Sequence, residues 1–245
     1  CDKTGPIWAR LCFNHDMESI WEYRSLLLSG TAVTIQLALA SLALSVLFGL
    51  IGAAAKLSAN RIGRRAANAY TTLIRGVPDL VLMMLLFYGG QQIVNDLGSV
   101  TGLWGYIEIN QFTAGVGSIG FVFGAYMTET FRGAILAIPR GQIEAGISVG
   151  MAPLTVFRRI TWPQMVRHAL PSFTNNWLVL IKATALVSVI GLHDLVWNAS
   201  TAGRSVREPF TFMFAVFIIY LLLTACSDVG LRWLERRYNV GIDRG

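Results

Sequence analysis

The sequence is poor in charge, because Asp, Glu, Lys and Arg together make up only 14% of its 245 residues, while 54% are hydrophobic. A soluble domain usually carries about 25% charged residues, so the composition argues against a soluble globular protein. Cysteine is also scarce, and Cys1, Cys12 and Cys226 lack any metal-binding or redox spacing. We therefore predict no catalytic residues, no metal site and no enzymatic activity for this chain.

Lysine is rarer still, and its positions exclude the commonest nucleotide site. A P-loop needs Gly-Lys followed by Ser or Thr, so that the lysine reaches the phosphates. The only lysines are Lys3, Lys56 and Lys182, and none follows a glycine. A Gly-x-Gly-x-x-Gly match at 115–120 has no strand before it, and small residues that let a neighbouring helix approach explain it better. An active transporter with this sequence would take its energy from an ion gradient or from another subunit.

Long apolar runs are what the sequence has instead. Five are long enough for a bilayer-crossing helix of about 20 residues, and none alternates like a β-barrel strand; they are Thr31–Ala55, Val77–Val94, Phe112–Ile138, Pro171–Leu192 and Pro209–Leu231. We predict an all-α polytopic membrane protein with five transmembrane helices in one domain, 17–245. Residues 1–16 are polar and lack periodicity, and we expect them to be a non-native or disordered leader.

The net charge of +6 is concentrated in three segments of the chain. Basic residues cluster between the first and second spans, after the third span and after the fifth, whereas Gly89–Gln111 has no Lys or Arg. The positive-inside rule then places the N-terminus in the periplasm and the C-terminus in the cytoplasm. We attribute the positive charge to membrane topology, and no nucleic-acid partner is expected.

One polar stretch, IEAGISVGMAPLTVFRRITWP at 143–163, interrupts the apolar pattern on the predicted cytoplasmic side. A short surface helix is expected after Pro139. Gly146 and Gly150 are four residues apart, which predicts one flat helix face where a neighbour can lie close, with Glu144 free to contact a partner. Two interpretations remain open: a docking surface for another protein, or an ordinary amphipathic interfacial helix.

The same stretch resembles the EAA loop of ABC-importer permeases, whose pattern is E-A-A-x3-G-x9-I-x-L-P. The matching positions are Glu144, Ala145, Gly146, Gly150, Ile160 and Pro163. Gly146 replaces the second alanine and keeps that position small, whereas Trp162 replaces the leucine and leaves the local packing open.

Further segments are similar to the polar-amino-acid branch of these permeases, in particular to the Q-type subunits of histidine, lysine, arginine and ornithine importers. They are TTLIRGVPDLVLMMLLFYG (71–89), AYMTETFRGAILAIPRGQIEA (125–145), NNWLVLIKATALVSVIGLHD (175–194) and LERRYNVG (234–241). The resemblance covers the chain from about Met17 to its end.

This resemblance implies a type I importer permease core in the bacterial inner membrane, with 139–163 as a cytoplasmic coupling helix that fits a groove on a separate ATPase. It also implies a homologous permease chain, two ATPase copies that bind ATP and Mg, and a periplasmic amino-acid-binding protein. The expected cargo is an amino acid, with basic ones favoured. The alternative is an ion-gradient-driven secondary transporter, although such proteins often show internal repeats and none is evident here.

Ionisable residues inside a predicted span are costly and are therefore candidates for substrate contact. Glu129, with Thr128 beside it, would suit an ammonium group or a cationic side chain, and Lys182 is the second candidate. The structural alternative is that Glu129 pairs with Arg132, three residues further on, or with Lys182 across helices. Asp194, at the outer end of the fourth span, fits a loop or a contact with the binding protein.

Overall fold

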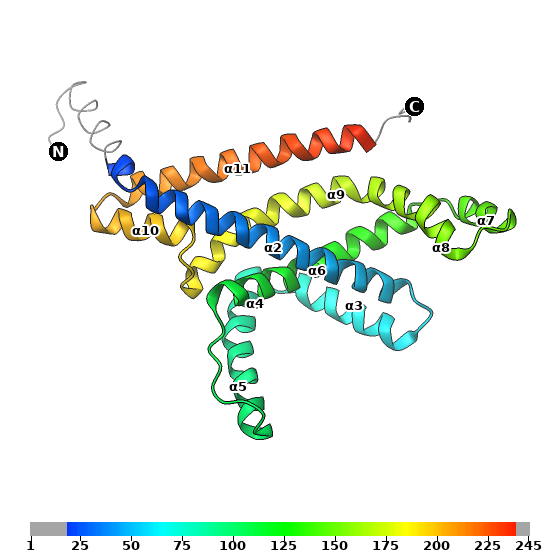
Figure 1. The fold of residues 1–245 in the computed structure, drawn as a ribbon, viewed down its shortest axis with the longest axis horizontal. Helices are drawn as coiled ribbons and strands as arrows, with labels where there is room; N and C mark the ends of the chain where they lie inside the picture. Colours follow the sequence, from blue (N-terminus) through cyan, green and yellow to red (C-terminus); the bar gives the residue numbers. More distant parts are fainter. Residues whose placement is uncertain (1–18, 239–245) are drawn as a thin grey trace.

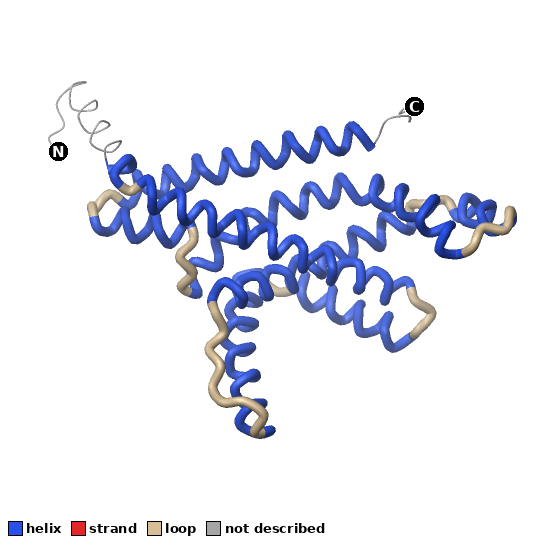
Figure 2. The backbone as a smooth tube through the Cα atoms, viewed as in Figure 1, coloured by secondary structure: helices blue, strands red, loops and turns tan. Residues whose placement is uncertain are grey.

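The computed structural model describes residues 19–238, and the regular elements of this part are all helical (Figures 1 and 2). The predicted leader lies outside the described residues. In chain order the elements are α2 (Arg24–Leu57), α3 (Arg61–Gly76), α4 (Asp79–Met84), the π-helical η1 (Leu85–Gly89), α5 (Gly90–Thr101), α6 (Gln111–Leu136), α7 (Arg140–Ser148), α8 (Pro153–Val156), the π-helical η2 (Phe157–Thr161), α9 (Trp162–Ala183), the 3-10 helix η3 (Thr184–Ile190), α10 (Leu195–Ser205) and α11 (Pro209–Tyr238).

Four helical stretches in the described residues are long and apolar enough to cross a membrane: Arg24–Leu57, Asp79–Thr101, Pro153–Ile190 and Pro209–Tyr238. Each overlaps one predicted span. Helix α6 coincides with the remaining predicted span but is not among the four, and it carries many glycines together with Glu129 and Arg132. The all-helical class is confirmed, and the count of five spans stays a prediction.

Helices α2 and α6 pack closely side by side and form the centre of the molecule (Figure 1). Small residues make this approach possible: a Cβ on Gly49 would lie 2.5 Å from the Cβ of Met127, and one on Gly120 would lie 2.7 Å from Leu44 Cδ2. Gly115 is in similar contact with Val187. The Gly-x-Gly-x-x-Gly match therefore belongs to helix packing, as the sequence predicted.

Two helices extend beyond the predicted spans. The fourth predicted span starts at Pro171, but α9 begins at Trp162 and Pro171 lies inside it; a membrane helix tolerates proline because neighbouring groups can satisfy the freed backbone. The first span continues past Ala55 to Leu57, so Lys56 belongs to the helix and not to a loop. The basic segment that follows is itself a helix, α3, which Asn60 caps by accepting a hydrogen bond from the Ile62 amide at 2.9 Å.

The basic segments of the sequence gather at one end of the fold. The C-terminal end of α2, the start of α3, the α7–α8 segment and the C-terminal end of α11 all lie toward the right of Figure 1. Helix α10 lies at the opposite end beside the start of α2, while α5 extends away from the body (Figure 1). Charge and tertiary structure thus define the same two ends of the molecule.

Candidate functional site

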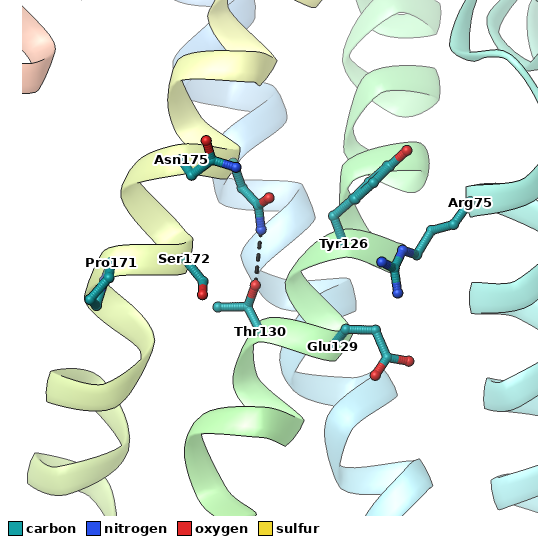
Figure 3. Close-up of a pocket in the computed structure, with 8 residues that line it drawn as sticks. Arg75, Tyr126, Glu129, Thr130, Pro171, Ser172 and Asn175 are labelled. Atoms are coloured by element: carbon teal, nitrogen blue, oxygen red, sulfur yellow. Dashed lines mark hydrogen bonds between the residues drawn. The ribbon is translucent and has the colours of Figure 1, made fainter. Parts of the chain in front are cut away.

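A cavity of about 470 Å³ lies between α3, α6 and α9 (Figure 3). Its walls are mostly polar, and they are formed by Arg75, Tyr126, Glu129, Thr130, Pro171, Ser172, Asn175 and Asn176. The amide of Asn176 donates a hydrogen bond of 2.9 Å to the Thr130 hydroxyl, which joins the α9 wall to the α6 wall. The cavity can offer a charged guanidinium, a phenol and several neutral hydrogen-bonding groups to a small polar ligand.

Glu129, the predicted substrate contact, lines this cavity but is already paired. One carboxylate oxygen accepts a short hydrogen bond from Lys56 Nζ, and the other accepts one of 3.0 Å from Arg132 Nε. The Lys56 side chain is only 7% exposed and also donates to the Thr71 hydroxyl at 2.6 Å. The predicted pair with Arg132 is therefore present, whereas the partner across helices is Lys56 and not Lys182.

The other two predicted substrate residues lie away from the cavity. Thr128 is fully buried against Gly52 of α2, and its hydroxyl donates to the Gly124 carbonyl at 2.8 Å. Lys182 is exposed and does not line the cavity. On the helical turn around Glu129, Thr130 rather than Thr128 points toward the cavity (Figure 3).

The predicted coupling segment forms a compact unit of two short helices and a tight turn. Helix α7 ends in a Schellman motif, in which the Gly150 amide donates to the Ile147 carbonyl at 2.9 Å and the Met151 amide donates to the Gly146 carbonyl at 3.1 Å. Gly150 adopts the left-handed conformation this motif requires, with φ of 81°, which glycine reaches without steric cost. Gly150 therefore ends the helix and does not extend its face.

Gly146 faces the inside of this unit, so the predicted flat contact face of two glycines is wrong. A Cβ at Gly146 would lie 2.8 Å from Ile160 Cδ1 and 3.4 Å from Val156 Cγ2. Gly146 is buried, and Ile160 packs the returning chain onto α7. Pro163 lies directly after the π-helical turn η2, inside the continuous helical stretch Pro153–Ile190.

The outer surface of the same unit is formed by different residues. Glu144 and Ala145 are exposed on α7, and Glu144 forms no ion pair within the described residues. Ile147, Val149 and Leu154 are 58%, 78% and 76% exposed. These exposed apolar residues form a small protruding surface, called the knob below, beside the carboxylate of Glu144. Exposed apolar patches with a polar rim are typical of protein–protein contact sites.

Asp194 is fully buried at the start of α10, and not at a surface where a binding protein could reach it. One carboxylate oxygen caps the helix by accepting from the Trp197 amide at 2.9 Å, while the other has no hydrogen-bond partner in the described residues. Burial raises the pKa of this carboxyl to about 6, although the capping bond favours its charged form. Asp194 thus serves helix α10 and not an outer contact.

Comparison with known proteins places these features in a family. The family model for the "binding-protein-dependent transport system inner membrane component" matches residues 45–240, which is most of the chain. The chain belongs to this family. Membership argues against the alternative of an ion-gradient-driven secondary transporter, and it confirms the resemblance to importer permeases.

Individual relatives of this permease family cover nearly the whole chain. It is 49% identical over 225 residues to the Escherichia coli histidine/lysine/arginine/ornithine permease protein HisQ, covering 92% of this chain and 98% of HisQ. It is 40% identical to the octopine permease protein OccQ of Rhizobium radiobacter, covering 92% of this chain and 94% of OccQ. A solved amino acid ABC transporter with histidines matches with a TM-score of 0.76 at 32% identity, covering 89% of this chain and 97% of the other.

Arg75 and the polar wall of α9 are the cavity residues that sequence reasoning missed. From the sequence, Arg75 is one of the basic residues between the first and second predicted spans and serves only the prediction of membrane topology. Ser172, Asn175 and Asn176 recur on the same side of α9 at helical spacing, and this polar stripe inside an apolar run was the signal that could have found them.

Proposed function

We propose that this chain is the membrane-spanning permease subunit of an ATP-driven amino-acid importer, and that basic amino acids are its cargo. The observation that carries the proposal is the 49% identity to HisQ over nearly the full length of both proteins. Family membership supports a role in binding-protein-dependent transport. The polar cavity between α3, α6 and α9 is a suitable place for the substrate to pass or pause.

The energy for transport would come from a separate ATPase that docks on the α7–α8 unit. The knob is rigid, since its turn is closed by the Schellman motif and its inside is packed around Gly146. Its exposed apolar residues and unpaired Glu144 would be the contact surface, and a side-chain hydrogen bond of 2.6 Å from Gln164 to Gln142 ties α7 to α9. A displacement of α7 by the ATPase would therefore also displace α9, which forms one wall of the cavity.

The remaining parts of the importer would be a homologous permease chain, a second copy of the ATPase and a periplasmic amino-acid-binding protein. In this arrangement ATP and Mg are bound by the ATPase and not by this chain. The end of the fold that carries α7, α8 and the basic segments faces the cytoplasm, as the positive-inside rule requires, and the end with α10 faces the periplasm.

Affinity purification of the chain from native membranes in mild detergent tests this function. We expect a P-loop ATPase and a second permease chain to co-purify, and basic amino acids to be taken up by the complex in ATP-containing proteoliposomes supplied with the binding protein. Glu144→Lys should lose the ATPase and uptake while keeping the second permease chain. Glu108→Lys, which reverses the same charge in the exposed loop after α5, is the matched control and should behave as wild type.

Two outcomes would contradict the proposal. Normal uptake with the ATPase still bound in Glu144→Lys would remove the docking role of α7. A chain recovered alone, yet able to transport with only an ion gradient, would remove the ABC-importer assignment.

A further inference from the structure

The cations around Glu129 outnumber the acids there, which is unexpected for the cationic cargo proposed above. Lys56 and Arg132 are in direct contact with Glu129, and Arg75 extends from α3 toward the same side of the cavity (Figure 3). Glu129 is the only acid among the lining residues. Because Lys56 and Arg132 already neutralise this acid from outside the lining, Arg75 is the charged lining residue that carries no ion pair within the described part of the chain.

Glu129 is not available to a cationic side chain without a large cost. Both carboxylate oxygens of Glu129 accept hydrogen bonds, and the side chain of its partner Lys56 is only 7% exposed. Removing the carboxylate from a buried ammonium leaves an uncompensated charge away from water, which is strongly unfavourable. The Lys56–Glu129–Arg132 group therefore joins α2 to α6 and does not wait for a ligand.

Arg75, in contrast, has its hydrogen-bonding capacity free. Its side chain is exposed to the cavity, its guanidinium lies 5.5 Å from the centre of the Tyr126 ring, and it forms no ion pair with a carboxylate in the described residues. A guanidinium presents five N–H donors in a planar fork that matches a carboxylate. Stacking near an aromatic ring leaves the edge of that fork open to a ligand.

We propose that Arg75 binds the α-carboxylate of the transported amino acid, and that the acid which meets a basic side chain lies outside this chain, on the second permease subunit. This inference rests on the proposed function. The side-chain oxygens of Ser172 and Asn175 on α9 can accept hydrogen bonds from the α-ammonium group, since neither side chain forms a hydrogen bond with another described residue. This chain then recognises what all amino acids share, and its partner selects the side chain.

Ligands that differ only at the carboxylate test the proposal without altering the protein. The intact complex, solubilised without the binding protein, is titrated with radiolabelled arginine, and agmatine, which is arginine without its carboxylate, is the competitor. A lost charge-assisted hydrogen-bonded pair corresponds to about a 10- to 100-fold loss of affinity, so agmatine should compete that much more weakly than unlabelled arginine. Equal competition by agmatine would overturn the proposal.

Variants then assign the effect to Arg75. Arg75→Gln should weaken arginine binding by about the same 10- to 100-fold and leave agmatine binding unchanged. Arg75→Lys keeps the charge but loses the planar guanidinium, so its affinity for arginine should lie between those of Arg75→Gln and the wild-type protein. Arg64→Gln removes the same charge from an exposed position on the same helix and should leave both ligands unaffected. Equal weakening of arginine and agmatine in Arg75→Gln would show a structural role and overturn the assignment.

The failure of this inference can be told apart from the failure of the proposed function. If agmatine competes as strongly as unlabelled arginine, only the role of Arg75 is overturned. A wild-type complex that binds none of arginine, lysine, ornithine or histidine overturns the basic-amino-acid proposal, and the role of Arg75 in that transport falls with it.

Discussion

Helix α2 and the stretch Asp79–Thr101 are both apolar enough to cross a membrane, yet the protein covers them very differently. The most apolar window of α2 has a mean hydropathy of 2.3 and is 39% buried inside the protein, whereas that of Asp79–Thr101 has 1.2 and is 6% buried. Helix α6 is not apolar enough to be among the four candidate spans. It nevertheless has twelve buried residues and lies at the centre of the molecule (Figure 1). Hydropathy therefore does not order these helices by their place in the core.

The difference follows from what drives helices together in lipid. Lipid tails are as apolar as leucine, so association depends on close van der Waals packing and polar contacts between helices. Glycines such as Gly49 and Gly120 bring α2 and α6 together, and the Lys56–Glu129 pair joins their ends. In Asp79–Thr101, Gly90 has nothing within 4 Å of its Cβ position, and the close contact of Gly98 is with Trp104 in the loop after α5 and not with another spanning helix.

The largest expected effect comes from filling the seam between α2 and α6. Gly49→Leu should destabilise the protein by about 3 kcal/mol, the upper part of the range for overpacked cores, because its Cβ would meet both the side chain and the backbone of Met127. Thermal unfolding in detergent measures the effect. Gly90→Leu, at the start of α5 with nothing within 4 Å of its Cβ, is the control and should stay close to wild type; equal losses would remove the distinction between the two regions.

The second effect concerns the polar contact at the end of the same seam. Lys56→Met should cost about 1–3 kcal/mol, because it leaves a partly buried carboxylate with one of its two partners. Arg232→Met breaks an ion pair with Asp228 on α11, where the arginine is 66% exposed, and should have a smaller effect, because solvent screens an exposed pair. Chemical denaturation of both variants gives the comparison, and Lys56→Met combined with Glu129→Gln should recover part of the loss. Equal losses of unfolding free energy in Lys56→Met and Arg232→Met would mean that the buried ion pair contributes no more to stability than the surface ion pair.

The smallest effect is a pH dependence at Asp194, outside the spans. Since burial raises its folded-state pKa to about 6, the folded protein holds this proton more tightly than the unfolded chain does. Stability from this group is therefore greatest at low pH and is lost as pH rises through 6, by about 1 kcal/mol between pH 5 and pH 7.

Asp194→Asn keeps a capping oxygen for the Trp197 amide and should remove this slope. Unfolding measured at pH 5, 6 and 7 for both proteins checks it, and the difference between the two proteins isolates the contribution of this carboxyl. A slope that persists in Asp194→Asn would assign it to another group.

Sequence patterns predicted the helical class and the approximate positions of the long apolar helices, because these depend on local composition and spacing. They failed where a helix face had to be chosen. Gly146 and Gly150 were placed on one face, but the chain turns after Ser148 and buries the first while the second closes the turn. Likewise Thr128 and Thr130 are both neighbours of Glu129, and only the packing of α2 against α6 and α9 decides which one reaches the cavity.

By itself the sequence determined that this is a membrane permease with no nucleotide site of the P-loop kind, since long apolar runs, charge distribution and the EAA spacing are properties of the chain read in order. Only the tertiary structure decided which charges meet. Lys56 and Glu129 are 73 residues apart in sequence, and their pairing depends on how far α2 extends and where α6 crosses it. That pairing occupies Glu129 and leaves Arg75 free, because an ion pair depends on distance in space and not on sequence separation.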